Sequence, residues 1–182
     1  MAKVRSKKCK VCEREFIPRN RFQKACSIEC AIKLSRKNAQ EEHDRAEKKK
    51  LKERKVKLKS RAEWLREAQE IFNKFIRLRD KNEPCISCGR YHQGQWHAGH
   101  YRSVGACPEL RFCELNVWKQ CSPCNNHKSG NAIEYRINLV KRIGAEKVEW
   151  LERHDHEPKK YTVEECKEII KYYKAKVKEL EV

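Results

Sequence analysis

Four close pairs of cysteines constrain this chain more than any other feature of its sequence. They contain eight of the eleven cysteines, and the members of each pair are separated by two or three residues. The pairs are Cys9 with Cys12, Cys26 with Cys30, Cys85 with Cys88, and Cys121 with Cys124. Two such pairs can surround one tetrahedral zinc ion with four thiolates and leave no open position, which is typical of a structural site. We therefore predict two structural Zn2+ sites, one from the first two pairs and one from the last two.

Disulfide bonds are the other common use of many cysteines, and they occur mainly in secreted proteins. Residues 1–12 have no apolar stretch that would direct secretion, and eleven is an odd number. No segment approaches the roughly 18 apolar residues of a membrane span, so we expect a cytoplasmic protein with no membrane partner. A mean hydropathy of −1.00 leaves little apolar surface for a large core. Zinc binding would supply the missing folding energy.

The net charge points to a polyanionic partner. It is +18, from 44 Lys and Arg against 26 Asp and Glu, and nucleic acid is the polyanion that such an excess favours. Residues 33–61 have 13 basic and 5 acidic side chains, which would neutralise several phosphates if spread along a helix. A solvated helix face is the alternative interpretation. The candidate DNA contacts are Lys48, Lys49, Lys50, Arg54 and Lys55, together with Arg102, Lys119 and Lys128 in the central segment.

The succession of these features predicts a small α+β protein in three parts. Residues 1–32 would form a four-cysteine zinc knuckle, residues 33–80 a basic helical arm, and residues 81–182 a zinc-bracketed module with C-terminal helices. The knuckle either contacts a nucleic acid or protein partner or serves only to stabilise the fold, and the sequence leaves both readings open.

Helices are predicted along most of the chain. Residues 31–61 lack Gly and Pro and predict one long solvated helix. From Trp64 onward, apolar side chains recur at three- and four-residue spacing, which predicts a helix with a buried face. Residues 132–143 and 163–180 predict two more helices, separated by a turn at Gly144 and a polar segment.

The segment between the last two cysteine pairs carries residues suited to phosphodiester hydrolysis. His100, Asn116 and Asn125 resemble the signature residues of HNH (ββα-metal) endonucleases, in the variant that ends in Asn and is bracketed by cysteine pairs. The knuckle, the basic helix and the later motifs HAGHYRS, CPELRF and LNVWKQCSPCNNHKSGN also resemble the NinG (Rap) recombination proteins of lambdoid bacteriophages. This resemblance implies a structure-specific endonuclease that acts on branched recombination intermediates, including Holliday junctions and D-loops.

The same resemblance implies branched DNA as the partner, in the cytoplasm of the host cell. Phage or host recombination proteins are further candidate partners. Symmetric cleavage of a four-way junction needs two active sites, so a homodimer is attractive, although no heptad repeat in the sequence requires one.

Roles follow for individual residues of the HNH-like motif. Hydrolysis needs a base of near-neutral pKa and a cation beside the leaving oxygen. We assign His100 as the general base, and Asn116 as the residue that orients its loop through hydrogen bonds to the backbone. Asn125 is the expected ligand of a catalytic Mg2+ or Mn2+ ion. The position that often carries Asp in HNH enzymes is Gly99, so we expect His97 or His127 to supply the second ligand.

Each of these catalytic roles has a structural alternative. His100 would then be a structural histidine, and Asn125 a helix cap. The whole chain would be a non-catalytic zinc protein that binds nucleic acid as a recombination accessory, or an RNA-binding zinc protein. Cys107, Cys113 and Cys166 lie outside both cysteine sets and are expected to be buried apolar groups or spare thiols.

Overall fold

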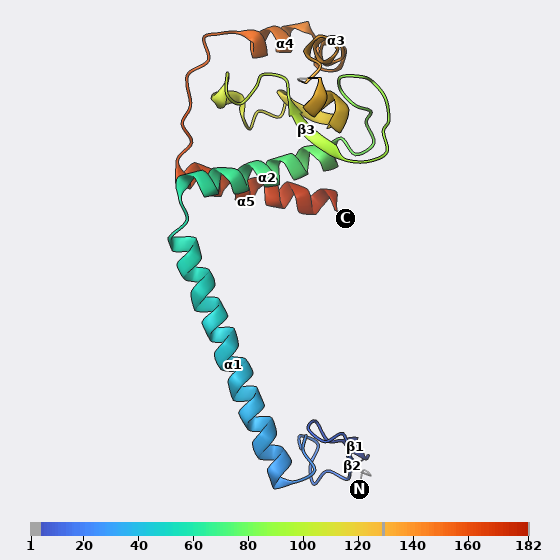
Figure 1. Cartoon of the computed structure of the whole chain (residues 1–182), viewed down its shortest axis with the longest axis vertical. Helices are drawn as coiled ribbons and strands as arrows, with labels where there is room; N and C mark the ends of the chain where they lie inside the picture. The colour runs from blue at the N-terminus through green and yellow to red at the C-terminus, as the bar shows by residue number, and fades with distance from the viewer. Residues whose placement is uncertain (1–4, 129, 182) are drawn as a thin grey trace. The chain divides into compact units, whose positions relative to one another are not determined.

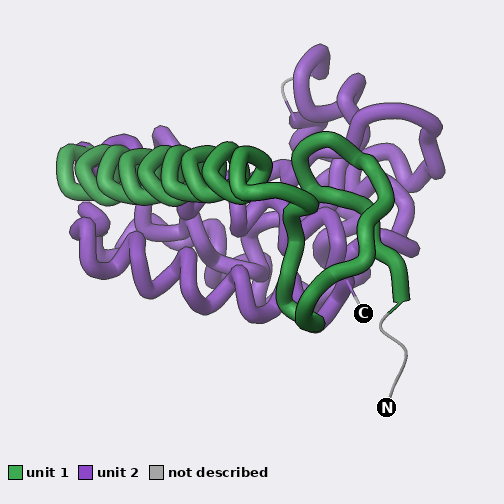
Figure 2. Tube along the Cα trace, turned by 90° about the horizontal axis from the view of Figure 1, so that it is seen from below, with its two compact units in different colours: residues 1–59 green, residues 60–182 purple. Residues whose placement is uncertain are grey.

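The computed structural model describes residues 5–128 and 130–181. It divides the chain into two compact units, residues 1–59 and 60–182, which Figure 2 colours separately. The division falls inside the segment 33–80 that the sequence groups as one arm. This segment contains most of the helix at residues 28–57, which has no buried residue, and all of the helix at residues 61–79, which has a buried face.

The first unit contains a small hairpin and one long helix. Strand β1 (Lys7–Lys8) pairs antiparallel with β2 (Glu15–Phe16), and helix α1 (Ile28–Lys57) follows. Ser27 caps α1 by accepting a hydrogen bond from Cys30 N. The helix has no buried residue, as the sparse apolar pattern predicts, and at 1.5 Å per residue it is about 45 Å long.

The second unit contains the remaining elements. They are α2 (Arg61–Arg79), β3 (Trp96–His100), η1 (Pro108–Leu110), β4 (Val117–Cys121), η2 (Pro123–His127), α3 (Ala132–Ile143), α4 (Ala145–Glu152) and α5 (Val163–Leu180). Ser60 and Glu63 form a capping box that starts α2. The mixed helix and sheet content confirms the predicted α+β class, and α3 and α5 confirm the two predicted C-terminal helices. Among the described residues, no helix is both long and apolar enough to cross a membrane.

Helix α4 was not predicted from the sequence. It starts directly after Gly144, which has a φ of 87° and ends α3, so a single glycine separates two helices. Its eight residues are too few to show a convincing helical period, yet Val148 and Leu151 are fully buried.

The β3–β4 hairpin lies between two helical layers, with α2 and α5 on one side and α3 and α4 on the other (Figure 1). Side chains alternate between the faces of a strand. Ala98 and Val117 face apolar residues of α2 and α5. Trp118 faces the cluster that includes Tyr135 of α3 and Leu151 of α4. The hairpin is therefore covered on both faces, which holds its ends in place.

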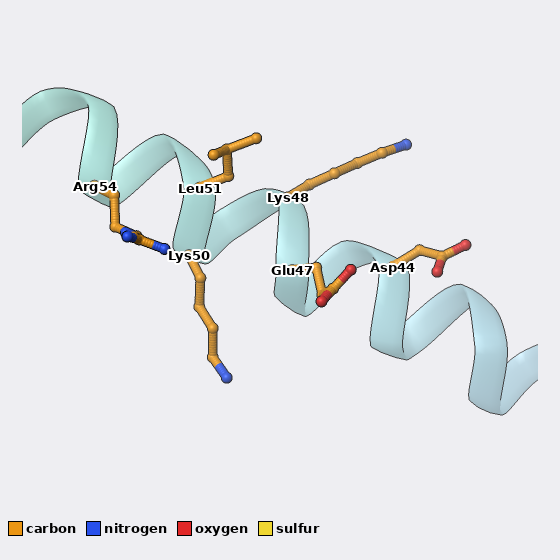
Figure 3. A pocket seen from close by; sticks show the side chains of 6 residues that line it. All are labelled: Asp44, Glu47, Lys48, Lys50, Leu51 and Arg54. Atoms are coloured by element: carbon orange, nitrogen blue, oxygen red, sulfur yellow. The ribbon is translucent and has the colours of Figure 1, made fainter.

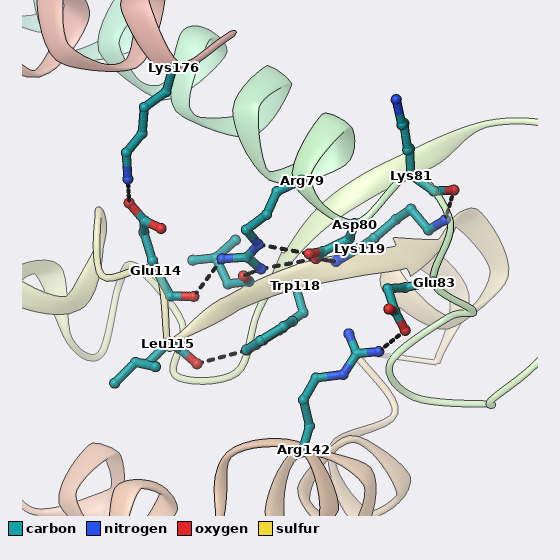
Figure 4. A network of polar contacts seen from close by, with 11 residues as sticks. Arg79, Asp80, Lys81, Glu83, Glu114, Leu115, Trp118, Lys119, Arg142 and Lys176 are labelled. Atoms are coloured by element: carbon teal, nitrogen blue, oxygen red, sulfur yellow. Dashed lines mark hydrogen bonds and ion pairs between the residues drawn. The ribbon is translucent and has the colours of Figure 1, made fainter. Parts of the chain in front are cut away.

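An ion pair between half-buried Arg79 and buried Asp80 joins the end of α2 to β4 (Figure 4). Arg79 donates to both carboxylate oxygens of Asp80 at 2.7 and 2.9 Å, and also to the carbonyl oxygens of Glu114 and Val117. Asp80 is only 3% exposed and accepts a hydrogen bond from Lys119 N at 3.0 Å. Each charge in this pair has further hydrogen-bond partners, which is the condition under which the buried Asp80 carboxylate is tolerated.

Candidate functional site

The second cysteine set is assembled as predicted. Cys85, Cys88, Cys121 and Cys124 have their sulfur atoms within 4.8 Å of one another, and the sulfurs of Cys88 and Cys121 are 4.0 Å apart. Zn–S bonds of 2.3 Å place tetrahedral sulfur ligands about 3.8 Å apart. The four thiols therefore fit one zinc ion. All eleven cysteines are free, so disulfides do not compete for these sulfurs.

This set connects the hairpin to the loop that follows α2. Cys121 is the last residue of β4 and pairs with Trp96 at the start of β3, while Cys85 lies in the loop and accepts a hydrogen bond from Cys121 N at 3.4 Å. His92, which the sequence did not single out, has Nε2 3.1 Å from Cys88 Sγ. In the sequence, only its position four residues after Cys88 could have indicated that His92 lies beside this cysteine set.

The first cysteine set fits zinc equally well. The sulfur of Cys26 lies 3.5 Å from that of Cys12 and 3.8 Å from that of Cys30, and Cys9 completes the group. Cys30 is in the first turn of α1, so zinc at this site would tie the knuckle to the helix.

His100 is the last residue of β3 and is held in one orientation. Its Nε2 is 3.0 Å from Arg111 O, and because a carbonyl oxygen only accepts, Nε2 must carry the hydrogen. The other ring nitrogen, Nδ1, then has the lone pair of a neutral imidazole and makes no hydrogen bond with any residue that the structure describes. Burial lowers the pKa of His100 below its ordinary value, and this outweighs the opposing effect of the hydrogen bond to Arg111. The ring is therefore prepared to accept a proton at Nδ1.

Asn116 makes the hydrogen bonds to backbone that the sequence predicts for it. It is fully buried; its Oδ1 accepts from Arg102 N at 2.7 Å, and its Nδ2 donates to the carbonyl oxygens of Arg102 and Leu110 at 3.0 and 3.1 Å. These bonds close the loop between the two strands. Arg111, whose carbonyl orients His100, directly follows Leu110 in that loop.

The proposed cation ligands are less closely assembled. His97 lies on the face of β3 opposite to His100, because the two residues are three positions apart in a strand. Asn125 and His127 lie in η2, a single turn of π-helix, where Asn125 Nδ2 donates to Asn126 Oδ1. Ser122, and not Asn125, precedes this turn as its cap residue. Within residues 5–128 and 130–181, only the two cysteine sets bring together three or more His, Cys, Asp or Glu ligands.

Gly99 lies directly against the side chain of Gln120. A Cβ atom at this position would lie 2.1 Å from Gln120 Oε1 and 2.9 Å from Gln120 Cδ. The side chain of Gln120, which the sequence did not single out, therefore occupies the space into which an Asp at position 99 would project.

Lys119 is a correction to the predicted DNA contacts. Its side chain points into the protein, and the residue is only 4% exposed (Figure 4). Its Nζ donates to Lys81 O at 2.9 Å and lies 4.3 Å from the centre of the Trp96 ring. Burial lowers the pKa of Lys119. Successive side chains of β4 alternate between its two faces, and Lys119 lies on the face that packs against the protein interior. Its ammonium group therefore cannot reach a phosphate.

The remaining candidate DNA contacts differ in accessibility. Lys128 is exposed, whereas Arg102 is half-buried and its Nε has no partner among the described residues. The five candidates on α1 are all exposed. Figure 3 shows Lys48, Lys50 and Arg54 extending from α1 in different directions, among Asp44, Glu47 and Leu51. The basic surface of α1 is thus available to a ligand along its length.

Comparison with known proteins identifies the family. Residues 1–182 match the family described as Bacteriophage Lambda NinG protein. The chain is 43% identical to the proteins named ninG of Escherichia phage 933W, Escherichia phage lambda and Salmonella phage P22, over 99% of this chain and 96% of each relative. No solved structure matches it. On both the family match and these relatives, the chain belongs to the NinG family of bacteriophage proteins.

Proposed function

We propose that this protein is a metal-dependent endonuclease that hydrolyses phosphodiester bonds in branched DNA, such as four-way junctions and D-loops. The observation that carries the proposal is the arrangement of His100. Its Nε2–H is committed to Arg111 O, its Nδ1 is left as an acceptor, and burial keeps the ring neutral. A ring held in one orientation with one nitrogen left as an acceptor is the arrangement that a general base requires.

In the proposed reaction, His100 Nδ1 removes a proton from a water molecule as its oxygen attacks phosphorus in line with the leaving O3′. The P–O3′ bond breaks, the products carry a 5′-phosphate and a 3′-hydroxyl, and solvent protonates the leaving oxygen. The hydrogen bond to Arg111 O stabilises the imidazolium that forms. A Mg2+ or Mn2+ ion held by Asn125, with His97 or His127, would supply charge stabilisation at the leaving oxygen.

The preference for branched DNA rests on charge and on the family resemblance. The net charge of +18 provides attraction to phosphates, and the exposed lysines of α1 extend this surface over about 45 Å. Such a length suits a substrate with more than one duplex arm. Symmetric cleavage of a junction would also require two copies of the chain.

Two observations favour a second function, that of a non-catalytic zinc protein which binds recombination intermediates. Apart from the two cysteine sets, the described residues contain no group of three His, Cys, Asp or Glu side chains close enough to hold a metal ion. Gly99 also replaces the carboxylate that HNH enzymes often have. An accessory protein would bind branched DNA without cutting it.

A cleavage assay separates the two functions. The zinc-loaded chain is incubated with a four-way junction, a linear duplex of the same sequence and a structured RNA, each with Mg2+, Mn2+ or EDTA. We expect cleavage of the junction only with a divalent cation, and little cleavage of the other substrates. Zinc content measured after EDTA treatment distinguishes loss of the catalytic cation from loss of structural zinc. Tight binding of the junction without cleavage under any condition would favour the accessory function.

The basic surface of α1 gives a second expected result. Replacing Lys48, Lys49 and Lys50 together by Gln should weaken junction binding and reduce the slope of log affinity against log salt by up to about one per lost phosphate contact. Fluorescence anisotropy at several salt concentrations measures both quantities. The matched control replaces three other exposed lysines by Gln, namely Lys160, Lys171 and Lys178. Equal losses in the two variants would mean that overall charge, and not α1, determines binding.

A further inference from the structure

Phe22 is an aromatic side chain that the fold leaves in solvent. It lies in the loop between β2 and α1, within the first unit, and is 74% exposed. Single exposed apolar residues are common and need no explanation by themselves. Phe22 differs from an ordinary case in the loop that carries it, in the charges around it and in the groove beside it.

The loop is held in one shape by polar groups. Asn20 Oδ1 accepts hydrogen bonds from the backbone nitrogens of Phe22 and Gln23, both at 3.0 Å. Gln23 Oε1 accepts from Arg19 N at 2.7 Å, and Gln23 Nε2 donates to Ala25 O at 2.9 Å. None of these bonds involves the phenyl ring, so the loop presents Phe22 without depending on it for its shape.

The surface around Phe22 is strongly basic. Residues 5–30 have eight Lys and Arg against three Asp and Glu, and all eight basic residues are exposed. The guanidinium of Arg21 lies 4.9 Å from the centre of the Phe22 ring. A flat group that packs on this ring would therefore have positive charge at its side, which suits a group linked to phosphates.

An open groove of about 670 Å3 lies between this loop and the first turns of α1. Arg19 and Lys24 line it in the loop, together with Gln23, the neighbour of Phe22, and Asn38 lines it on α1; none of its lining residues is acidic. Proteins that bind single-stranded nucleic acid combine a positively charged groove, which follows the backbone, with aromatic side chains on which bases stack. The first unit has both parts.

We propose that the first unit binds an unpaired DNA strand, with one base stacked on Phe22 and the adjoining phosphates in the groove beside Arg19 and Lys24. The bases of a duplex are already stacked on one another, so Phe22 should contribute to the binding of a single strand and not to that of a duplex. Eight exposed cations favour this polyanion over an apolar protein surface. The choice of DNA over RNA rests on the proposed function, whereas the binding mode does not depend on hydrolysis.

The test is the fluorescence anisotropy of a labelled thymidine oligonucleotide titrated with the zinc-loaded full chain, without added Mg2+ or Mn2+ so that no strand is cut. Phe22→Ala should weaken binding of the single strand about 5–150-fold, the range expected for one stacked base, and should leave the affinity for a duplex of equal length unchanged. Phe22→Leu, which is apolar but has no aromatic face, should bind like Phe22→Ala.

Two further variants complete the comparison. Phe22→Trp should bind the strand at least as tightly as the wild type, and the strand should quench its fluorescence more than that of the four native tryptophans. The matched control is Tyr91→Ala, because Tyr91 is an aromatic residue of the second unit that is 73% exposed. It should bind the strand like the wild type. Equal zinc content in all variants shows that the knuckle remains folded.

The groove has its own readout. Arg19→Gln combined with Lys24→Gln should weaken single-strand binding and reduce the slope of log affinity against log salt by up to about 1.4, or about 0.7 for each lost phosphate contact. Phe22→Ala should leave this slope unchanged, because stacking releases no counterions.

Several results would overturn the proposal. If the wild type does not bind the single strand, or Phe22→Ala binds it normally, the exposed ring is left for a protein partner. Equal losses for strand and duplex, or wild-type affinity in Phe22→Leu, would mean that no base stacks on Phe22. Tighter binding of an oligouridylate of equal length would assign the surface to RNA. If the strand binds through Phe22 but no junction is cut, the strand site stands and the endonuclease function fails.

Discussion

His100→Ala is expected to lower the rate of junction cleavage by about 10²–10⁴-fold, the usual contribution of a general base, while leaving junction affinity unchanged. The reason is the different role of each ring nitrogen. Nε2 donates a hydrogen bond to Arg111 O, so only Nδ1 can accept a proton from the reacting water. Single-turnover cleavage gives the rate, and anisotropy with Ca2+ gives the affinity.

The matched control is His154→Ala, because His154 is an exposed histidine in the segment between α4 and α5. It should cut at the wild-type rate. If His100→Ala also cuts at that rate, the base is another group. If it loses cleavage and affinity together, His100 maintains the fold of the loop and is not shown to act in the reaction.

The pH dependence provides an independent readout of the same residue. Proton abstraction requires the neutral imidazole, and burial lowers the pKa of His100 from its ordinary value of 6.5. The rate should therefore stay on its plateau as the pH falls through 6.5 and decline only at lower pH. A decline in the rate that is centred above pH 6.5 would assign it to a different group.

Cys121→Ser is expected to remove one of two bound zinc ions and to abolish cooperative unfolding of the second unit. Structural zinc contributes roughly 10–16 kcal/mol in small zinc domains, which matches or exceeds the whole 5–15 kcal/mol stability of an ordinary domain. The site also connects the end of β4 to the loop of Cys85. Thermal melting by circular dichroism and the zinc-to-protein ratio measure the two effects.

Two other cysteine variants make this result specific. Cys166 is fully buried but lies outside both sets, so Cys166→Ser should retain two zinc ions and lose only about 1–3 kcal/mol from burying a hydroxyl. Cys12→Ser should lose the zinc of the first unit and leave the melting of the second unit in place. Retention of two zinc ions by Cys121→Ser would contradict the assignment of this cysteine as a ligand.

Spacing along the chain was sufficient to predict several parts of the structure. The cysteine pairs act locally, since two thiols separated by two or three residues meet at one turn, and both sets of four are assembled as predicted. Helices α3 and α5 follow from the period of their apolar residues. The hydrogen bonds from Asn116 to the backbone were expected from its resemblance to a signature residue of HNH endonucleases.

Other features depend on residues that are far apart in the sequence. The burial of Lys119 follows from its inward position on β4 and from the carbonyl of Lys81, neither of which composition reveals. Helix α4 was missed because a single glycine separates it from α3, and because eight residues give little periodic signal.

The sequence by itself predicted the two four-cysteine sets, the α+β class and the candidate base, because cysteine spacing and helical period are properties of local segments. Only the tertiary structure decided what surrounds Gly99. The strand register sets His97 opposite Gln120, and two hydrogen bonds of Gln120 Nε2 direct its Oε1 toward Gly99. These contacts join residues that are 10 to 33 positions apart. Such contacts depend on how the strands and loops pack, and a pattern along the chain does not encode them locally.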